Sequence, residues 1–238
     1  MTVFLQIVFI FYLGSTFGWT IELFFRRIVH KKWVNPGFLI GPYLPIYGFG
    51  LVFLTIIYFI FQSQSINPII IILLMGFVMI LIELIGGLIS LKNKIRLWDY
   101  RDRWLNYKEI ICPLFSVIWT IVGALYYYII AEDIMNALGW FSENIAFSYI
   151  LGIFTGLIII DAFYSCKLYS KIKKYAKENN IIIKYEQLKI DIKEFQKSAR
   201  EKYSFLNPFN QTKPLKNYLN LYKEKTKNRV NLINPIFI

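Results

Sequence analysis

Charged side chains are missing from one long part of this sequence. Residues 33–82 hold no Asp, Glu, Lys or Arg, although the chain has 27 basic and 15 acidic residues. A helix of about 20 apolar residues can span a bilayer, so this stretch can span it twice. The chain is 56% hydrophobic and only 18% charged. These features exclude a soluble enzyme and predict an integral membrane protein.

Residues that carry catalysis or bind metals are also scarce. The chain has two cysteines, Cys112 and Cys166, and one histidine, His30. It contains no HExxH, CxxC or GxSxG motif, and no Gly-Lys dipeptide that could belong to an ATPase phosphate loop. We expect the cysteines to be reduced packing residues and His30 to be interfacial. No enzymatic activity, cofactor or metal is expected.

Five apolar segments predict an all-α, polytopic membrane helical bundle. Helices are expected because an open segment in lipid must satisfy its own backbone hydrogen bonds. The predicted spans are about residues 3–25, 44–61, 69–91, 110–130 and 145–166. Residues 1–166 would form the bundle, and residues 167–238 would form a basic, partly helical tail.

The basic residues predict the orientation of the bundle. All of them lie between spans one and two, between spans three and four, or after span five. The other connections have none, and residues 131–144 carry Glu132, Asp133 and Glu143. Since Lys and Arg stay cytoplasmic, the N-terminus is expected outside and the C-terminus inside the cytoplasmic membrane. Topology and attraction to anionic lipid account for the net charge of +12, so no nucleic-acid partner is expected.

The tail has 17 basic and 6 acidic residues. Leu188, Ile192, Phe195 and Ala199 recur at helical spacing, which predicts an amphipathic helix over about residues 185–203. A basic amphipathic helix of this kind suits the membrane surface. A docking platform for a cytosolic subunit is the alternative.

Three acids lie inside predicted spans: Glu22, Glu83 and Asp161. All three are near the cytoplasmic ends, so we expect them to share one layer and line a polar site. A carboxylate in the hydrocarbon region is normally paired with an opposite charge, in contact with water, or protonated. For Glu22, a structural i,i+4 ion pair with Arg26 is the competing interpretation. Glu83 needs a partner from another helix, such as Arg26 or Arg27, or a water-filled pocket.

Two irregular segments lie beside these acids. Residues 35–50 contain three prolines and four glycines, so they cannot form a regular helix. They form either a broken entry into span two, with Tyr43 and Tyr47 supplying hydroxyls, or a structured cytoplasmic elbow. In residues 97–104, Trp98, Asp99 and Tyr100 suit an interfacial segment. A cytoplasmic loop of this kind could also contact a motor subunit or a lipid phosphate.

Glycine pairs at i,i+4 spacing occur in two spans, at Gly14 and Gly18 and at Gly152 and Gly156. This spacing lets helix backbones approach closely, so it predicts a packed bundle. It carries no indication of chemistry.

Five runs of residues carry a family resemblance. They are GWTIE at 18–22, VNPGFLIGPYLPIYGFG at 34–50, ELIGGL at 83–88, WDY at 98–100 and ICPLFSVIW at 111–119. Through them roughly the first 165 residues resemble the putative ABC transporter permease (type IV, CmpB-like) family of bacterial membrane proteins. The family usually has Arg where Pro36 stands, and Asn-x-x-Gly where this chain has residues 106–109.

The resemblance implies a permease subunit that needs a separate ATPase. Glu22, Glu83 and Asp161 would line its polar site, and Trp98, Asp99 and Tyr100 would lie at its coupling face. Five spans are few for a permease, so a homo-oligomer or a partner would complete the pathway. One rival hypothesis is a non-transporting scaffold or regulator with structural carboxylates. The other is an enzyme that acts on lipid-linked substrates, with the carboxylates as acid and base.

Overall fold

The structure is a computed structural model that describes residues 2–31, 33–198, 219–220 and 222–224. Its longest elements are helices, as predicted. In the described residues, four helices are long and apolar enough to cross a membrane. They cover Val3–Ile28, Pro68–Lys92, Pro113–Glu143 and Ile145–Glu178. The chain is therefore built as a multi-pass membrane protein.

The helices follow one another in a simple order. They are α1 (Thr2–His30), α2 (Pro45–Phe61), α3 (Pro68–Lys92), α4 (Pro113–Leu125), α5 (Ala131–Glu143), α6 (Ser148–Glu178) and α7 (Tyr185–Ser198). Three of them, α2, α3 and α4, begin with proline. Proline suits the first helical position because its missing N–H would have no partner there. Helix α2 has 17 residues, or about 25 Å at 1.5 Å per residue, so it is shorter than the four long spans.

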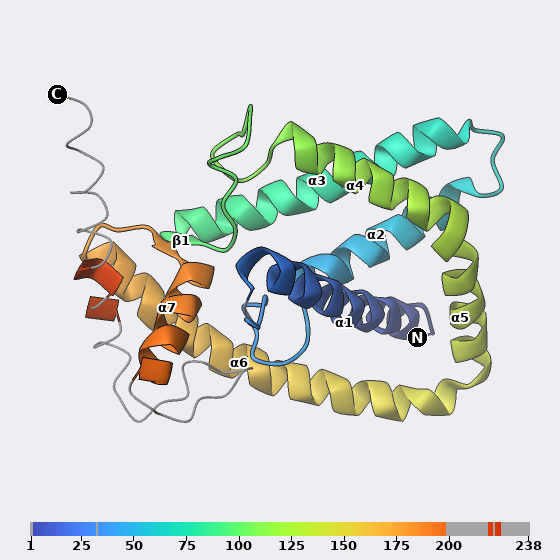
Figure 1. The fold of residues 1–238 in the computed structure, drawn as a ribbon. Helices are drawn as coiled ribbons and strands as arrows, with labels where there is room; N and C mark the ends of the chain where they lie inside the picture. The colour runs from blue at the N-terminus through green and yellow to red at the C-terminus, as the bar shows by residue number, and fades with distance from the viewer. Residues whose placement is uncertain (1, 32, 199–218, 221, 225–238) are drawn as a thin grey trace.

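Helices α1 and α2 pack closely, and α3 pairs with α4 (Figure 1). The first glycine pair explains the α1–α2 approach. A Cβ added at Gly14 would lie 2.7 Å from the Cβ of Leu51, and one at Gly18 would lie 2.2 Å from the Cγ of Tyr47. The second pair differs, because a Cβ at Gly152 or Gly156 would meet no described atom within 4 Å outside its own helix. Close packing is therefore found only at the first pair within the described residues.

Residues 131–144, which the charge pattern treats as a connection, are mostly helical. A π-helical turn over Tyr126–Ile130 (η1) follows α4, and α5 continues from it. Figure 1 shows the chain changing direction there, so that α5 crosses the end of the bundle. Leu138 and Phe141 of α5 are buried, whereas Glu132 and Asp133 occupy its first turn, where acids interact favourably with the helix dipole. A short 3₁₀ turn, η2 (Ile145–Phe147), then leads into α6.

The opposite end of the bundle carries a small separate core. Helix α6 continues beyond Cys166 to Glu178, and the chain then returns through β2 (Ile183–Lys184) into α7. Strand β2 pairs in parallel with β1 (Ile95–Arg96), a two-residue addition to the predicted all-α fold. The members of this core include Ile95, Ile172, Ala176, Ile183, Leu188 and Ile192. Helix α7 begins where the sequence predicts a helix, and the predicted end at Tyr203 lies outside the described residues.

Candidate functional site

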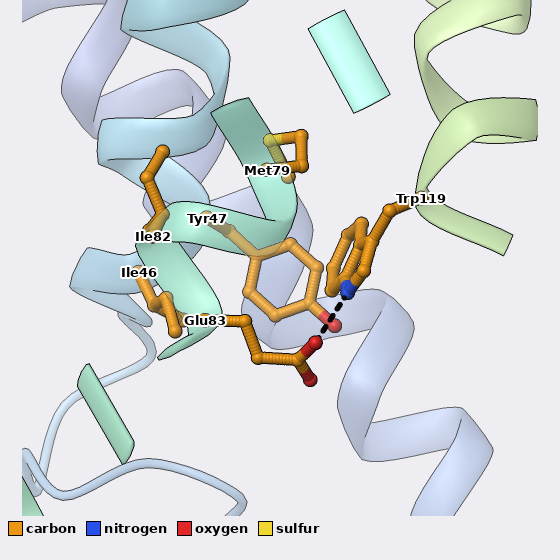
Figure 2. Close-up of a pocket in the computed structure, with 6 residues that line it drawn as sticks. All are labelled: Ile46, Tyr47, Met79, Ile82, Glu83 and Trp119. Carbon is orange, nitrogen blue, oxygen red and sulfur yellow. Dashed lines mark hydrogen bonds between the residues drawn. The ribbon is translucent and has the colours of Figure 1, made fainter. Parts of the chain in front are cut away.

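The Glu83 side chain lies in the middle of the bundle and is only 5% exposed. Tyr100 Oη donates a hydrogen bond of 2.7 Å to Glu83 Oε1, and Trp119 Nε1 donates one of 2.9 Å to Oε2. Figure 2 shows Trp119 of α4 turned toward this carboxylate of α3. Neither Arg26 nor Arg27 pairs with Glu83, and in the described part of the chain no basic nitrogen lies within 4.0 Å of it. Two neutral donors replace the expected cation.

A small cavity adjoins this carboxylate (Figure 2). Its volume is about 10 Å³, close to the space that one water molecule needs. The rings of Tyr47 and Trp119 meet edge to face there, with centroids 5.8 Å apart. The six residues that line the cavity are Ile46, Tyr47, Met79, Ile82, Glu83 and Trp119.

Glu22 of α1 approaches the same tyrosine. Tyr47 Oη donates a hydrogen bond of 3.0 Å to Glu22 Oε2, while Arg26 Nε donates one of 3.0 Å to Oε1. The i,i+4 ion pair expected for Glu22 and Arg26 is therefore present. Arg26 also forms an ion pair with Glu186 of α7, which the sequence did not indicate. Tyr47 can lie this close to α1 because residue 18 is glycine.

Asp161 takes part in a different contact. Its carboxylate accepts hydrogen bonds from the backbone N–H of Ile40 (3.0 Å) and Gly41 (2.7 Å), and from Ser165 Oγ (2.9 Å). It is not among the residues that line the cavity. The structure thus brings Glu22 and Glu83 together around Tyr47, whereas Asp161 fastens the irregular segment between α1 and α2 to α6.

The irregular segment is shorter than predicted, because residues 45–50 belong to α2, whose first residue Pro45 suits the first helical position. The irregular backbone is limited to residues 33–44 and is organised around Asn35, which is 2% exposed. Asn35 Oδ1 accepts hydrogen bonds from Trp19 Nε1 (2.9 Å) and the Gly37 N–H (3.1 Å). Its Nδ2 donates to the carbonyls of Leu39 (3.1 Å) and Ile40 (2.9 Å). Every hydrogen-bonding atom of this amide is therefore used. Asn35 was not predicted as a functional residue, although an asparagine directly before Pro-Gly in an uncharged stretch is a usable signal.

The other tyrosine predicted for this segment, Tyr43, has its ring against Gly41, where an added Cβ would lie 2.2 Å from Tyr43 Cε2. Arg27 is turned away from the acids. Its guanidinium donates to the carbonyl of Lys31 and lies 5.6 Å from the centre of the Trp33 ring. Neither residue supports the Glu83 carboxylate.

Lys189 of α7 reaches the same irregular segment and is 4% exposed. Its Nζ donates to the carbonyls of Asn35, at 3.0 Å, and Gly37, and lies 4.6 Å from the centre of the Tyr185 ring. Burial, and then the positive charge of Arg26, lower the pKa of Lys189 to about 7, against the raising effect of Glu186. This lysine could not be singled out among the many basic residues of the tail.

The predicted coupling residues, Trp98, Asp99 and Tyr100, have separate partners. Trp98 Nε1 donates to the Ile110 carbonyl at 2.9 Å. Asp99 forms ion pairs with Arg96 (3.2 Å) and with Lys184 (2.5 Å) of β2. Tyr100 alone turns inward to Glu83. The segment is thus connected both to the tail and to the buried carboxylate.

The protonation states of this segment follow from its surroundings. Partial burial favours the neutral form of Asp99, but the hydrogen bond from Lys184, the Arg101 N–H and the nearby cations hold its pKa below the ordinary value. Burial, and then the charge of Glu83, raise the pKa of Tyr100 well above its ordinary value. Asp99 is therefore an anion and Tyr100 a hydrogen-bond donor at neutral pH.

The described residues contain no group of three or more His, Cys, Asp or Glu side chains placed to hold a metal ion. Cys112 is buried, Cys166 is exposed, and both are free thiols.

Comparison with known proteins adds one match. A family model described as "Putative ABC-transporter type IV" matches residues 9–166, well over half of the chain. No curated protein and no solved structure matches. The matched region contains Glu22, Glu83, Trp119 and Asp161. It ends within α6, before the residues that α6, β2 and α7 contribute to the small core.

Proposed function

Because this chain belongs to the Putative ABC-transporter type IV family, we propose that it is the permease subunit of an ABC-type transporter and works with a separate ATPase. One observation carries the proposal. Tyr100, from the segment predicted to face a motor subunit, donates a hydrogen bond to Glu83, which is buried beside a cavity. ATP hydrolysis belongs to the partner, and no reaction is assigned to this chain.

The proposal places five spans in the cytoplasmic membrane, with the N-terminus outside and the tail inside. Helix α2 is the fifth span, and α5 lies at the outer surface. The distribution of charge along the sequence supports this orientation. All Lys and Arg residues lie near the α1–α2 connection, near the α3–α4 connection or from Lys167 onward, whereas Glu132, Asp133 and Glu143 belong to α5.

Coupling in this proposal begins at Trp98, Asp99 and Tyr100. A movement of the segment caused by the ATPase would withdraw the Tyr100 hydroxyl from Glu83. The carboxylate would then lose one of its two donors and change its affinity for a ligand in the cavity. Tyr47, which donates a hydrogen bond to Glu22, forms a second wall of this polar site. Asp161 holds in place the irregular segment of residues 33–44, which we call the elbow.

We also propose that the working transporter is an oligomer of this chain. Five spans are few for a transport pathway, and one face of α6 is open. Phe163 on that face is 77% exposed, and Gly152 and Gly156 have no close neighbour outside their helix within the described residues. Cysteine cross-linking at Gly152 in native membranes would reveal a dimer, and an exclusively monomeric product would contradict the oligomer.

The first experiment is purification of the full-length tagged chain from its native membrane in mild detergent, followed by mass spectrometry of the co-purified proteins. We expect a stoichiometric nucleotide-binding subunit. A charge-matched pair of variants, Asp99→Asn in the coupling segment and Asp133→Asn on α5, tests the contact. The first should lower recovery of the ATPase and the second should not. Repeated purification of the folded chain without an ATPase would refute the permease function.

The second candidate is a non-transporting membrane scaffold or regulator. The contacts of Asp161 favour it, because that carboxylate is fully engaged in holding the elbow. The two functions differ for Glu83→Gln. A permease with this change should stay folded and lose transport, whereas a scaffold should lose only stability.

A further inference from the structure

We propose that the cavity beside Glu83 binds an ammonium group, either the ammonium ion itself or the head group of a primary amine. The proposal deepens the permease function by naming the class of ligand. Transport of the ligand rests on the proposed permease function, whereas binding of the ligand requires this chain alone.

The first argument is the balance of charge around Tyr47. Arg26 is the one cation that pairs with Glu22 among the described residues, and it is shared with Glu186. Among the residues that the structure describes, Glu83 has only the neutral donors Tyr100 and Trp119. Burying a carboxylate without a counter-charge is costly. A cation placed in the cavity would neutralise the charge of Glu83.

The second argument is the wall of the cavity. The Tyr47 and Trp119 rings meet there at 5.8 Å, and Glu83 lies next to both (Figure 2). Trp119 presents its N–H edge to this carboxylate, and the apolar side chains of Ile46, Met79 and Ile82 complete the lining. Because the attraction between opposite charges is stronger where water is excluded, the carboxylate recognises a small cation in this cavity by charge.

The third argument concerns size and donor atoms. Hard metal ions such as Ca²⁺ and Mg²⁺ require six or more oxygen ligands. The side chains lining this cavity offer only the carboxylate of Glu83 and the hydroxyl of Tyr47, because the other four are Ile46, Met79, Ile82 and Trp119. An ammonium group needs few acceptors and fits a volume of about 10 Å³, whereas a quaternary ammonium group is too large and has no N–H to donate.

The test is thermal unfolding of the full-length chain in phosphatidylcholine nanodiscs at pH 7 and constant ionic strength. The added salts are the chlorides of ammonium, methylammonium, sodium and tetramethylammonium. We expect a saturable rise in Tm with the first two, roughly 5–10 °C at 100 times Kd, and no rise with the others. A response to both would identify an amine head group, and a response to ammonium alone would identify the free ion.

Three variants tie the effect to the cavity. Glu83→Gln can keep both hydrogen bonds, because the amide oxygen accepts from Trp119 and the amide nitrogen donates to the Tyr100 hydroxyl. It should nonetheless lose the response. Ile46→Phe should also lose it by filling the cavity while leaving the carboxylate in place. Glu132→Gln removes the same charge from the exposed surface of α5 and should respond like the unmodified chain.

An equal shift with sodium, or a full response in Glu83→Gln, would overturn the ammonium site. These outcomes differ from failure of the permease function. A chain that responds to ammonium but never purifies with an ATPase would keep the site and refute the permease. A chain that purifies with an ATPase but shows no Tm response to ammonium would keep the permease function and refute the ammonium site.

Discussion

Tyr100 donates a 2.7 Å hydrogen bond to Glu83, and this contact joins the segment after α3 to the interior of the bundle. The two residues are 17 positions apart in the sequence. The Tyr100 ring also stacks on Phe115 of α4, with centroids 4.3 Å apart. Stacking of the ring therefore fixes the position of the segment, and the hydroxyl contacts the carboxylate directly.

The Tyr100→Phe change separates these two roles. Stacking on Phe115 should persist, but a buried carboxylate oxygen loses its donor, which costs about 1–3 kcal/mol of unfolding free energy. Thermal unfolding of the full-length protein measures the loss. Tyr107→Phe is the control, since Tyr107 lies in the same segment and is 53% exposed. Equal losses in the two variants would rule out the hydrogen bond as the cause.

The approach of α1 to α2 predicts a marked difference between two glycines. Gly18→Ala places a Cβ about where the Tyr47 ring begins. We expect overpacking to lower stability by about 1–3 kcal/mol and to displace the Tyr47 hydroxyl from Glu22. Gly139→Ala on α5 meets no described atom within 4 Å and should leave stability unchanged or slightly raised. The Tm values of the two variants test this difference. An unchanged Tm in Gly18→Ala would contradict the close packing of α1 on α2.

The elbow between α1 and α2 should respond to Asp161→Asn. The amide keeps one acceptor oxygen but turns an NH₂ group toward a backbone N–H, at a cost of about 1–3 kcal/mol. Hydrogen exchange at Ile40 and Gly41 should become faster as these amides lose their acceptor. Asp133→Asn on the exposed surface of α5 is the control. Unchanged exchange at both amides in Asp161→Asn would mean that the carboxylate does not hold the elbow.

Attachment of α7 should depend on pH through Lys189. Its pKa is about 7 when α7 is packed on the bundle, mainly because of burial, and returns to the ordinary value of 10.5 when α7 detaches. Between these values the detached form binds a proton that the packed form does not, so attachment strengthens as pH rises from about 7 to 10 and is nearly constant below 7. The charged groups that face Lys189 are Arg26 and Glu186, and the Tyr185 ring lies 4.6 Å from its Nζ.

Limited proteolysis of the tail at pH 6.5 and pH 9, with each protease activity normalised on an unfolded substrate, measures this dependence. Cleavage within α7 should be slower at pH 9. Lys189→Met removes the titrating group, so its cleavage should change less between the two pH values. The same pH response in both proteins would assign the effect to another group.

The sequence predicts the parts of this fold that depend on local composition. Long apolar runs mark the four long helices, and the i,i+4 spacing marks the pair of Glu22 with Arg26. Helix α5 was not predicted, because the acids at 131–144 indicate a connection outside the membrane, although Leu138 and Phe141 supply an apolar face.

The partners of the buried acids could not be predicted in the same way. Trp119 lies 36 positions from Glu83, and Gly41 lies 120 positions from Asp161. Such pairs are set by how whole helices pack, and local spacing contains no record of that packing. A charge in a span indicates that a partner is required, but a phenol, an indole or a backbone amide can meet the requirement as well as an arginine.

The elbow at residues 33–44 also has a consequence for how the protein is made. The residues that hydrogen-bond to it from the later helices, Asp161 and Lys189, lie more than 100 positions further along the sequence. Chains emerge from the ribosome N-terminal end first, so α1 and α2 enter the membrane while the segment between them has neither contact. Helices α1 and α2 can pack on each other through Gly14 and Gly18 at that stage, but the elbow lacks its contacts with Asp161 and Lys189 until α6 and α7 arrive. A chain cut short before α7 never gains the Lys189 contact.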